Sequence, residues 1–107
     1  MTATTVSTVY AVFATLDQAD RIGRTVVEER LAACVNILAP VRSFYRWQGE
    51  VRRADEVAAI IKTSRDKADA LIDRIIEMHS YDVPCVVTWP VDKVPESYAR
   101  WVAESVG

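Results

Sequence analysis

The stretch that decides the fold is residues 33–63, which read ACVNILAPVRSFYRW, then QG, then EVRRADEVAAIIKT. The first arm alternates in character, and Gln48-Gly49 predicts a turn before the second arm, so the stretch predicts one long β-hairpin. Residues 57–61 are apolar on both faces, which is typical of a central strand. Pro40 cannot donate a backbone hydrogen bond and therefore favours an edge strand or a bulge.

The residues on either side of the hairpin predict two further strands and three helices. Residues 6–14 are rich in β-branched and aromatic types and predict a strand. Thr15 and Gln18 fit a capping box. In this motif the threonine side chain accepts a hydrogen bond from an unpaired N–H of the first helical turn, and the glutamine side chain accepts one from the backbone at the cap. The helix that follows is expected to run to about Arg30, with an apolar stripe of Leu16, Ala19, Ile22, Gly23, Val26 and Val27. Further along we expect a helix at 64–79 with the stripe Ala68, Leu71, Ile72, Ile75 and Ile76, a strand at 85–89 and a helix at 96–105.

The resulting order is β-α-β-β-α-β-α, an α+β chain with the ferredoxin-like, or split βαβ, arrangement. With right-handed crossovers the strands form one antiparallel sheet in the order 4-1-3-2, covered by helices on one face. We expect a single domain over residues 1–107, from which the long hairpin protrudes. His79 and Cys85 should meet at one end of the sheet, while Cys34 and Lys62 lie at the other. The two cysteines are then too far apart for a disulfide.

Composition excludes several classes of function. The chain has 107 residues, with 13 Lys and Arg against 15 Asp and Glu, so its formal charge is −2 and no basic block offers a nucleic-acid surface. No apolar run approaches the roughly 18 residues of a membrane span. We therefore expect neither nucleic acid nor a membrane as a partner. Two isolated cysteines favour reduced thiols and a cytoplasmic location.

Catalysis would have to combine one thiol with the single histidine. Cys34 is expected at the wrong end of the sheet. Cys85 is expected near His79, but no third group that would orient the imidazole is evident, and a small buried hydrophobe is the commoner role for such a cysteine. His79 is equally well explained as a favourable charge at the C-terminus of its helix. We therefore expect no enzymatic activity.

Four stretches closely resemble the CutA divalent-cation tolerance proteins: VEERLAACVNI at 27–37, YRWQGE at 45–50, IKT at 61–63 and HSYDVP at 79–84. The resemblance covers nearly the whole chain. It implies a ferredoxin-like subunit in a homotrimer, related in architecture to the PII signalling proteins. It also implies a link to the tolerance of copper and other divalent cations, without an established reaction.

The same resemblance implies a copper site that combines a cysteine at the end of the first strand with a histidine at the end of the second helix. The cysteine position is Phe13 here, the histidine carries over to His79, and Met78 stands where some members have a second histidine. Because residues 85–89 should pair with the first strand, the Cys85 thiol is expected near the place of the missing cysteine. We therefore expect His79 and Cys85 to bind copper or another divalent cation weakly, with no metal required for folding.

Tyr45 and Trp47 also match family positions, and we expect them at the interface between subunits, because Tyr and Trp are typical interface anchors. For Tyr81 we expect packing, and for Lys62 a stem that lies along the sheet while its charge reaches solvent. Two functions stay open. One is a cytoplasmic, homotrimeric copper-tolerance protein that binds metal ion, and the other is a PII-like signalling or scaffold module that binds a small ligand or a protein partner at the subunit clefts.

Overall fold

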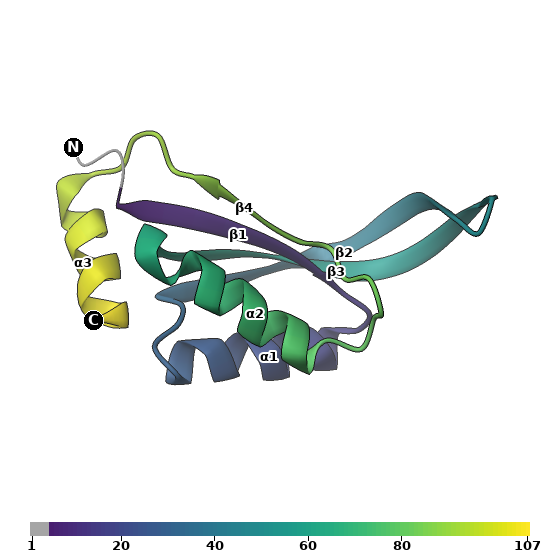
Figure 1. Cartoon of the computed structure of the whole chain (residues 1–107), viewed down its shortest axis with the longest axis horizontal. Coiled ribbons are helices and arrows are strands. Elements are labelled where there is room, and N and C mark those ends of the chain that lie inside the picture. The colour runs from purple at the N-terminus through teal and green to yellow at the C-terminus, as the bar shows by residue number, and fades with distance from the viewer. Residues whose placement is uncertain (1–4) are drawn as a thin grey trace.

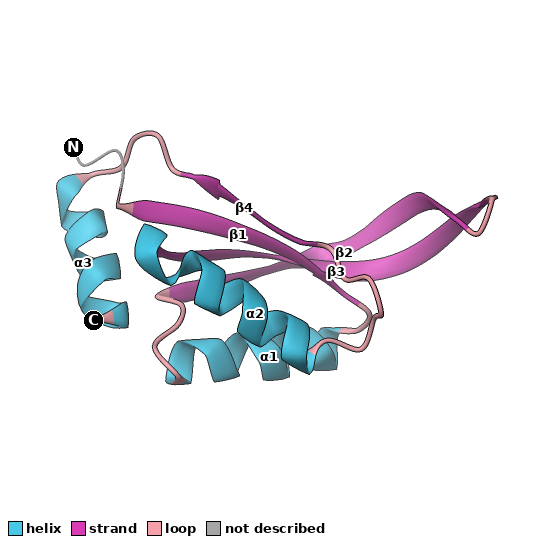
Figure 2. Cartoon of the chain, in the orientation of Figure 1, coloured by secondary structure: helices cyan, strands magenta, loops and turns pink. Residues whose placement is uncertain are grey.

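The computed structural model describes residues 5–107, with the backbone alone at position 39, as one antiparallel sheet with three α-helices (Figure 1). The molecule is elongated, with extents of 45 × 25 × 23 Å. Figure 2 shows that one part of the sheet is accompanied by helices, whereas the end of the hairpin extends away from them. The elements in chain order are β1 (Val6–Phe13), α1 (Leu16–Glu28), β2 (Cys34–Trp47), β3 (Glu50–Ser64), a 3₁₀ turn (Arg65–Lys67), α2 (Ala68–Met78), β4 (Val86–Pro90) and α3 (Glu96–Val106).

The strands of the described residues lie in the order β2-β3-β1-β4. Read from the β4 edge, this is the order 4-1-3-2 that the sequence analysis expects. β3 is therefore an interior strand, which explains why residues 57–61 are apolar on both faces. β1 pairs with β3 along its whole length, from Val6 opposite Ser64 to Phe13 opposite Val57.

β2 and β3 form the long hairpin. Its turn consists of Gln48 and Gly49, whose φ angles are 51° and 80°, and positive φ at both central positions is the type I′ geometry that suits a two-residue turn. The pairing register shifts between Ile37 and Pro40 on the edge strand β2, so the proline occupies an edge strand and a bulge together. None of residues 41–55 is buried, and this part of the hairpin extends past the helices (Figure 1).

α1 begins at the predicted cap but buries a narrower stripe than expected. The Oγ1 atom of Thr15 accepts from the backbone N–H of Gln18 at 3.1 Å, and Gln18 Oε1 accepts from the N–H of Ala14 at 3.2 Å, one residue before the cap position. Leu16 and Val27, which we expected on the buried stripe, are 55% and 40% exposed. With 3.6 residues per turn, both lie roughly 70–90° from the centre of the buried stripe, so they flank it.

α2 begins later than the sequence predicts. β3 continues through Ser64, which pairs with Val6, and the N–H of Arg65 donates to the carbonyl of Thr5 at 3.0 Å. Sheet pairing therefore holds the residues that would have formed the first helical turn, and a single 3₁₀ turn precedes the helix. In the predicted stripe, Ala68, Leu71 and Ile75 are buried, Ile72 is half-buried and Ile76 is exposed.

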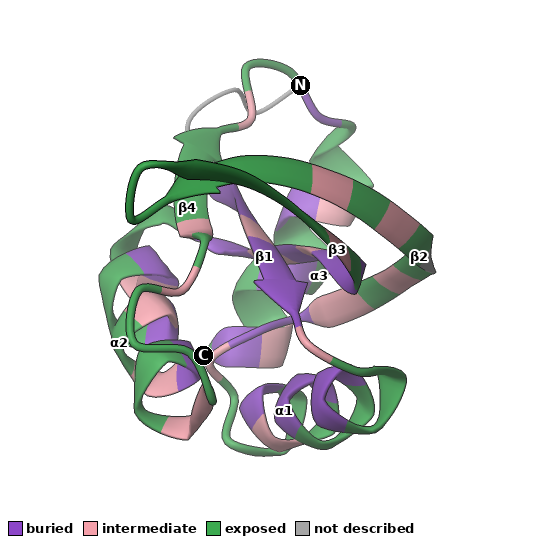
Figure 3. Ribbon diagram, turned by 90° about the vertical axis from the view of Figure 1, so that its right-hand side faces the viewer, coloured by how far each residue is buried: buried purple, intermediate pink, exposed green. Residues whose placement is uncertain are grey.

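The main core lies between the sheet and the helices α1 and α2, and Figure 3 shows buried residues concentrated along β1 and the inner faces of these helices. α3 does not join them. It packs at the end of the sheet where β1 begins, in a separate apolar cluster with Val6 and Ala33, which corrects the expectation that all helices cover one face. On β4, Val87 and Trp89 are 47% and 45% exposed. No helix among residues 5–107 has the length and apolar character to cross a membrane.

Candidate functional site

His79 and Cys85 lie at the same end of β1, where both form hydrogen bonds with the backbone of Val12. The carbonyl oxygen of Val12 lies 2.7 Å from Nε2 of His79, and the N–H of Val12 donates to the carbonyl of Cys85 at 3.1 Å. The ring of Phe13 stacks on the imidazole, with centroids 5.3 Å apart and an interplanar angle of 16°. The expected juxtaposition of these segments is therefore present.

Both ring nitrogens of His79 are engaged in hydrogen bonds. Nε2 carries the proton, because the carbonyl of Val12 can only accept. The backbone N–H of Tyr81 donates to Nδ1 at 3.1 Å and uses the remaining lone pair. His79 therefore joins the end of α2 to β1 and to the following loop through both ring nitrogens.

A metal ion at His79 would have to displace one of these bonds. Within residues 5–107, no group of three or more His, Cys, Asp or Glu side chains is placed to hold a metal ion. The two predicted ligands thus lie at one end of the sheet without forming a completed metal centre in the single chain.

The two thiols are free and differ in exposure. Cys85 is exposed, which corrects the expectation of a small buried hydrophobe. Cys34 is half-buried, and its Sγ atom lies 3.4 Å from the hydroxyl of Tyr98 on α3. Burial, and then the hydrogen bond with Cys34, raise the pKa of Tyr98 to about 12. Lys62 lies opposite Cys34 in the pairing of β2 with β3. Its ammonium group donates to Oδ1 of Asn36 on β2 at 2.8 Å, so the side chain of Lys62 lies along the sheet as expected.

A pocket of about 670 Å³ opens between the hairpin, β1 and the loop that precedes β4, and we call it the hairpin-root pocket. Cys85 lies on its wall, whereas His79 does not line it. The lining combines four aromatic rings, two carboxylates and one guanidinium: Tyr10, Tyr45, Trp47, Tyr81, Glu56, Asp82 and Arg52. The two residues predicted for a subunit interface, Tyr45 and Trp47, are therefore also pocket residues.

Tyr81 and Glu56 form a hydrogen-bonded pair of side chains in this pocket. The hydroxyl of Tyr81 donates to Glu56 Oε2 at 2.8 Å, and its ring centroid lies 4.9 Å from that of His79. Burial, followed by the hydrogen bond with Glu56, raises the pKa of Tyr81 to about 12. Glu56 is only 9% exposed, and the sequence analysis did not single it out. The only sequence signal was a charged residue directly before the buried run that starts at Val57.

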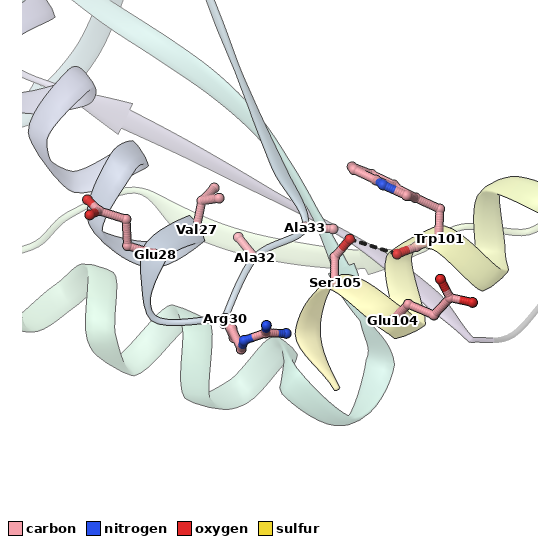
Figure 4. Close-up of a pocket in the computed structure, with 8 residues that line it drawn as sticks. All are labelled: Val27, Glu28, Arg30, Ala32, Ala33, Trp101, Glu104 and Ser105. Atoms are coloured by element: carbon pink, nitrogen blue, oxygen red, sulfur yellow. Dashed lines mark hydrogen bonds between the residues drawn. The ribbon is translucent and has the colours of Figure 1, made fainter.

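A second pocket, of about 460 Å³, lies between the end of α1 and the helix α3 (Figure 4). Glu28, Arg30 and Glu104 give it charges of both signs. The hydroxyl of Ser105 donates to the carbonyl of Trp101 at 2.8 Å, within α3. The lining that the structure describes here contains none of the residues predicted for a metal site or a subunit interface, so the hairpin-root pocket is the candidate site.

Comparison with known proteins gives a consistent result over nearly the whole chain. Residues 7–105 match the sequence model of a family described as CutA1 divalent ion tolerance protein. A divalent-cation tolerance protein CutA from Pyrococcus horikoshii is 42% identical over 96 residues, which are 90% of this chain and 93% of that protein.

Solved structures agree with the sequence matches. The crystal structure of CutA from Xylella fastidiosa has a TM-score of 0.93 at 32% identity and covers 95% of this chain and 98% of its own. The structure of the periplasmic divalent cation tolerance protein CutA from Archaeoglobus fulgidus has a TM-score of 0.92 at 35% identity, with coverage of 95% and 99%.

Proposed function

Because the chain belongs to the CutA1 divalent ion tolerance family, we propose that it acts in divalent-cation tolerance as a homotrimer that binds metal ion and catalyses no reaction. The observation that carries the proposal is the hairpin. Its outer part exposes large apolar side chains, among them Phe44 at 69%, Val51 at 65%, Tyr45 at 43% and Trp47 at 41%.

Such exposure supports self-association. By the strand register, Phe44 and Val51 lie on one face of the outer hairpin, whereas Tyr45 and Trp47 lie on the other. A projecting arm with apolar side chains on both faces and an unpaired strand edge favours aggregation unless it is covered. Val87 and Trp89 extend the exposed apolar surface onto β4. Packing against neighbouring copies covers the outer hairpin except where Tyr45 and Trp47 line the hairpin-root pocket. The family resemblance implies that three chains assemble.

The absence of a catalytic role is supported by the state of His79. A thiol nucleophile needs a nearby base to take its proton. Nδ1 of His79 already accepts from the Tyr81 N–H, and Nε2 carries a proton that is directed at the Val12 carbonyl. The imidazole is thus a structural contact and not a base for Cys85.

For the metal ion we propose Cys85 as the first ligand, because its thiol is exposed, with His79 as the second. His79 can bind the metal through Nδ1 only after the hydrogen bond from the Tyr81 N–H to this atom is broken. The net contribution of such a hydrogen bond to stability is about 0.5–1.5 kcal/mol. Weak binding of Cu(I), Cu(II) or Zn²⁺ is the expected consequence, since thiolate and imidazole suit these ions. Two free thiols support a reducing compartment, and we propose the cytoplasm.

Assembly is tested by light scattering on the purified full chain at micromolar concentration. The expected mass is that of three chains. Trp47→Ala should lower the average mass without changing helical circular dichroism, whereas Trp101→Ala, which truncates a tryptophan of similar exposure on α3, should leave the mass unchanged. A monomeric wild-type protein would refute the assembly.

Metal binding is tested by calorimetric titration of Cu²⁺ and Zn²⁺ into protein purified without an affinity tag. Cys85→Ser should remove most of the binding, and His79→Ala should weaken it. Cys34→Ser, at the other end of the sheet, is the matched control. If both Cys85→Ser and His79→Ala keep the wild-type stoichiometry and affinity, the metal site is elsewhere or absent.

A second candidate function is a PII-like module that binds a small ligand, and the hairpin-root pocket favours it. Ligand sites of this size are usually lined by aromatic and apolar side chains with a few convergent polar groups, as here. A thermal-shift screen against small metabolites tests this candidate, because a ligand that binds only the folded state raises the melting temperature.

A further inference from the structure

The hairpin-root pocket contains an almost buried carboxylate with no basic partner. Glu56 is 9% exposed, and none of the ion pairs found among residues 5–107 involves it. Among the described residues, its side-chain hydrogen bond is the one accepted by Oε2 from the Tyr81 hydroxyl at 2.8 Å. Acidic side chains are seldom this deeply buried unless a positive group pairs with them.

Aromatic rings surround this carboxylate. Tyr45 and Trp47 line the pocket from β2 and are 43% and 41% exposed, and Tyr81 lines it from the loop before β4. Tyr81 is held in place at two points, by its hydroxyl on Glu56 and by its backbone N–H on His79. One wall is therefore ordered before any ligand arrives, which lowers the entropic cost of binding.

The charge of the lining favours a positive occupant. Glu56 and Asp82 provide two carboxylates, and Arg52 is the only Lys or Arg among the described lining residues. Aromatic faces attract a cation through the negative face of the ring, and this attraction is the usual means by which proteins recognise substituted ammonium groups. The pocket volume of about 670 Å³ also exceeds what a bare metal ion needs, and no three ligands converge on one point in the described residues.

We propose that the hairpin-root pocket binds a small organic ammonium ion, with its positive group between Tyr45, Trp47 and Tyr81 and with Glu56 as its counter-charge. This inference rests on the ligand-binding candidate function. Cys85, the first proposed metal ligand, lies on the pocket wall, so EDTA in the test keeps the inference separate from the metal proposal.

The test is calorimetric titration of the assembled wild-type protein with tetramethylammonium chloride, in the presence of EDTA. tert-Butanol, which is similar in size but uncharged, is titrated in parallel. A cation–π contribution of this kind is worth roughly 0.5–2 kcal/mol, which corresponds to a preference of about 2- to 30-fold for the ammonium ion. Equal affinity for the two probes, or no binding of either, overturns the proposal.

Variants separate the possible causes. Glu56→Gln and Trp47→Leu should each weaken tetramethylammonium binding by about tenfold, and Trp101→Leu on α3 should not change it. Circular dichroism and light scattering on the same samples identify a variant that has lost its fold or its assembly. If Glu56→Gln fails to fold, Tyr45→Leu replaces it, because this exposed ring can be removed without opening the core.

Arg52→Gln tests whether the charge of Arg52 opposes the bound cation. It should leave tetramethylammonium binding unchanged or strengthen it, because it removes a like charge. Loss of tetramethylammonium binding in Arg52→Gln would mean that Arg52 supports the site instead of repelling the cation, and this would overturn the proposal. Since EDTA is present throughout, failure here leaves the metal titrations of Cys85→Ser and His79→Ala as a separate test.

Discussion

Replacement of His79 by phenylalanine tests whether the imidazole stabilises the fold through its hydrogen bonds or is available to bind a metal ion. In the structure the ring holds α2, β1 and the following loop together through Val12 O at 2.7 Å and the Tyr81 N–H at 3.1 Å. A phenylalanine ring keeps the contacts with Phe13 and Tyr81 but removes both hydrogen bonds.

The magnitude follows from the number of bonds lost. Each intramolecular hydrogen bond contributes about 0.5–1.5 kcal/mol net, so His79→Phe should lower the free energy of unfolding by about 1–3 kcal/mol. His79→Ala also loses two ring contacts, with Phe13 at 5.3 Å and with Tyr81 at 4.9 Å. Such pairs are worth about 0.5–1.5 kcal/mol each beyond their buried area, so the alanine variant should be the less stable of the two.

The assay is urea denaturation in EDTA, followed by circular dichroism at a fixed chain concentration, because the stability of an oligomer depends on concentration. Two outcomes refute the reasoning. In the first, the free energy of unfolding of His79→Phe differs from that of the wild type by less than about 0.5 kcal/mol, which is below the range expected for the two lost hydrogen bonds. In the second, EDTA alone destabilises the wild type as much as the substitution does, as expected for a ring that holds a metal ion.

Three further predictions follow from the geometry. Mild oxidation should not produce a Cys34–Cys85 disulfide, because the four-residue stretch of β1 that separates them spans about 13 Å and a disulfide needs Cα atoms within about 7 Å; mass spectrometry after alkylation detects the bond. Tyr81 and Tyr98 have pKa values raised from the ordinary 10 to about 12, so their contribution to stability is complete below pH 10 and is lost as the pH rises through 12. Phenolate absorbance should therefore show two late-titrating tyrosines, and their titration near pH 10 would contradict the geometry. Leu71→Ala, at a fully buried core position, should cost about 2–5 kcal/mol in urea denaturation, and a loss below 1 kcal/mol would mean that the core collapses around the cavity.

The elements that could be predicted are those whose signals are local. Gln48-Gly49 between two long arms identified the hairpin, because a two-residue turn with positive φ has few alternatives. Thr15 identified the start of α1 for a similar reason. The delayed start of α2 could not be predicted, because Ser64 is held by Val6, a partner far away in the sequence.

The candidate site was only partly visible in the sequence. The meeting of His79 and Cys85 followed from topology, but the hydrogen bonds of the imidazole did not, because they involve backbone atoms of Val12 and Tyr81 that carry no sequence signal. Glu56 was missed because its partner, Tyr81, lies 25 residues further along the chain. A carboxylate in a hairpin arm is normally solvated, and only the folded loop covers it.

The register shift at Pro40 has a consequence for how the length of the hairpin can change. Beyond this shift β2 and β3 pair in regular register up to the turn, so the shift decides which side chains each face of the outer hairpin presents. Adding or removing one residue there would exchange the two faces and move Trp47 to the opposite side. The tip is different, because residues added there lie beyond the last pair, Trp47 and Glu50, and leave the register of the two arms unchanged. We therefore expect related chains to vary in length at the tip and to keep their spacing around Pro40.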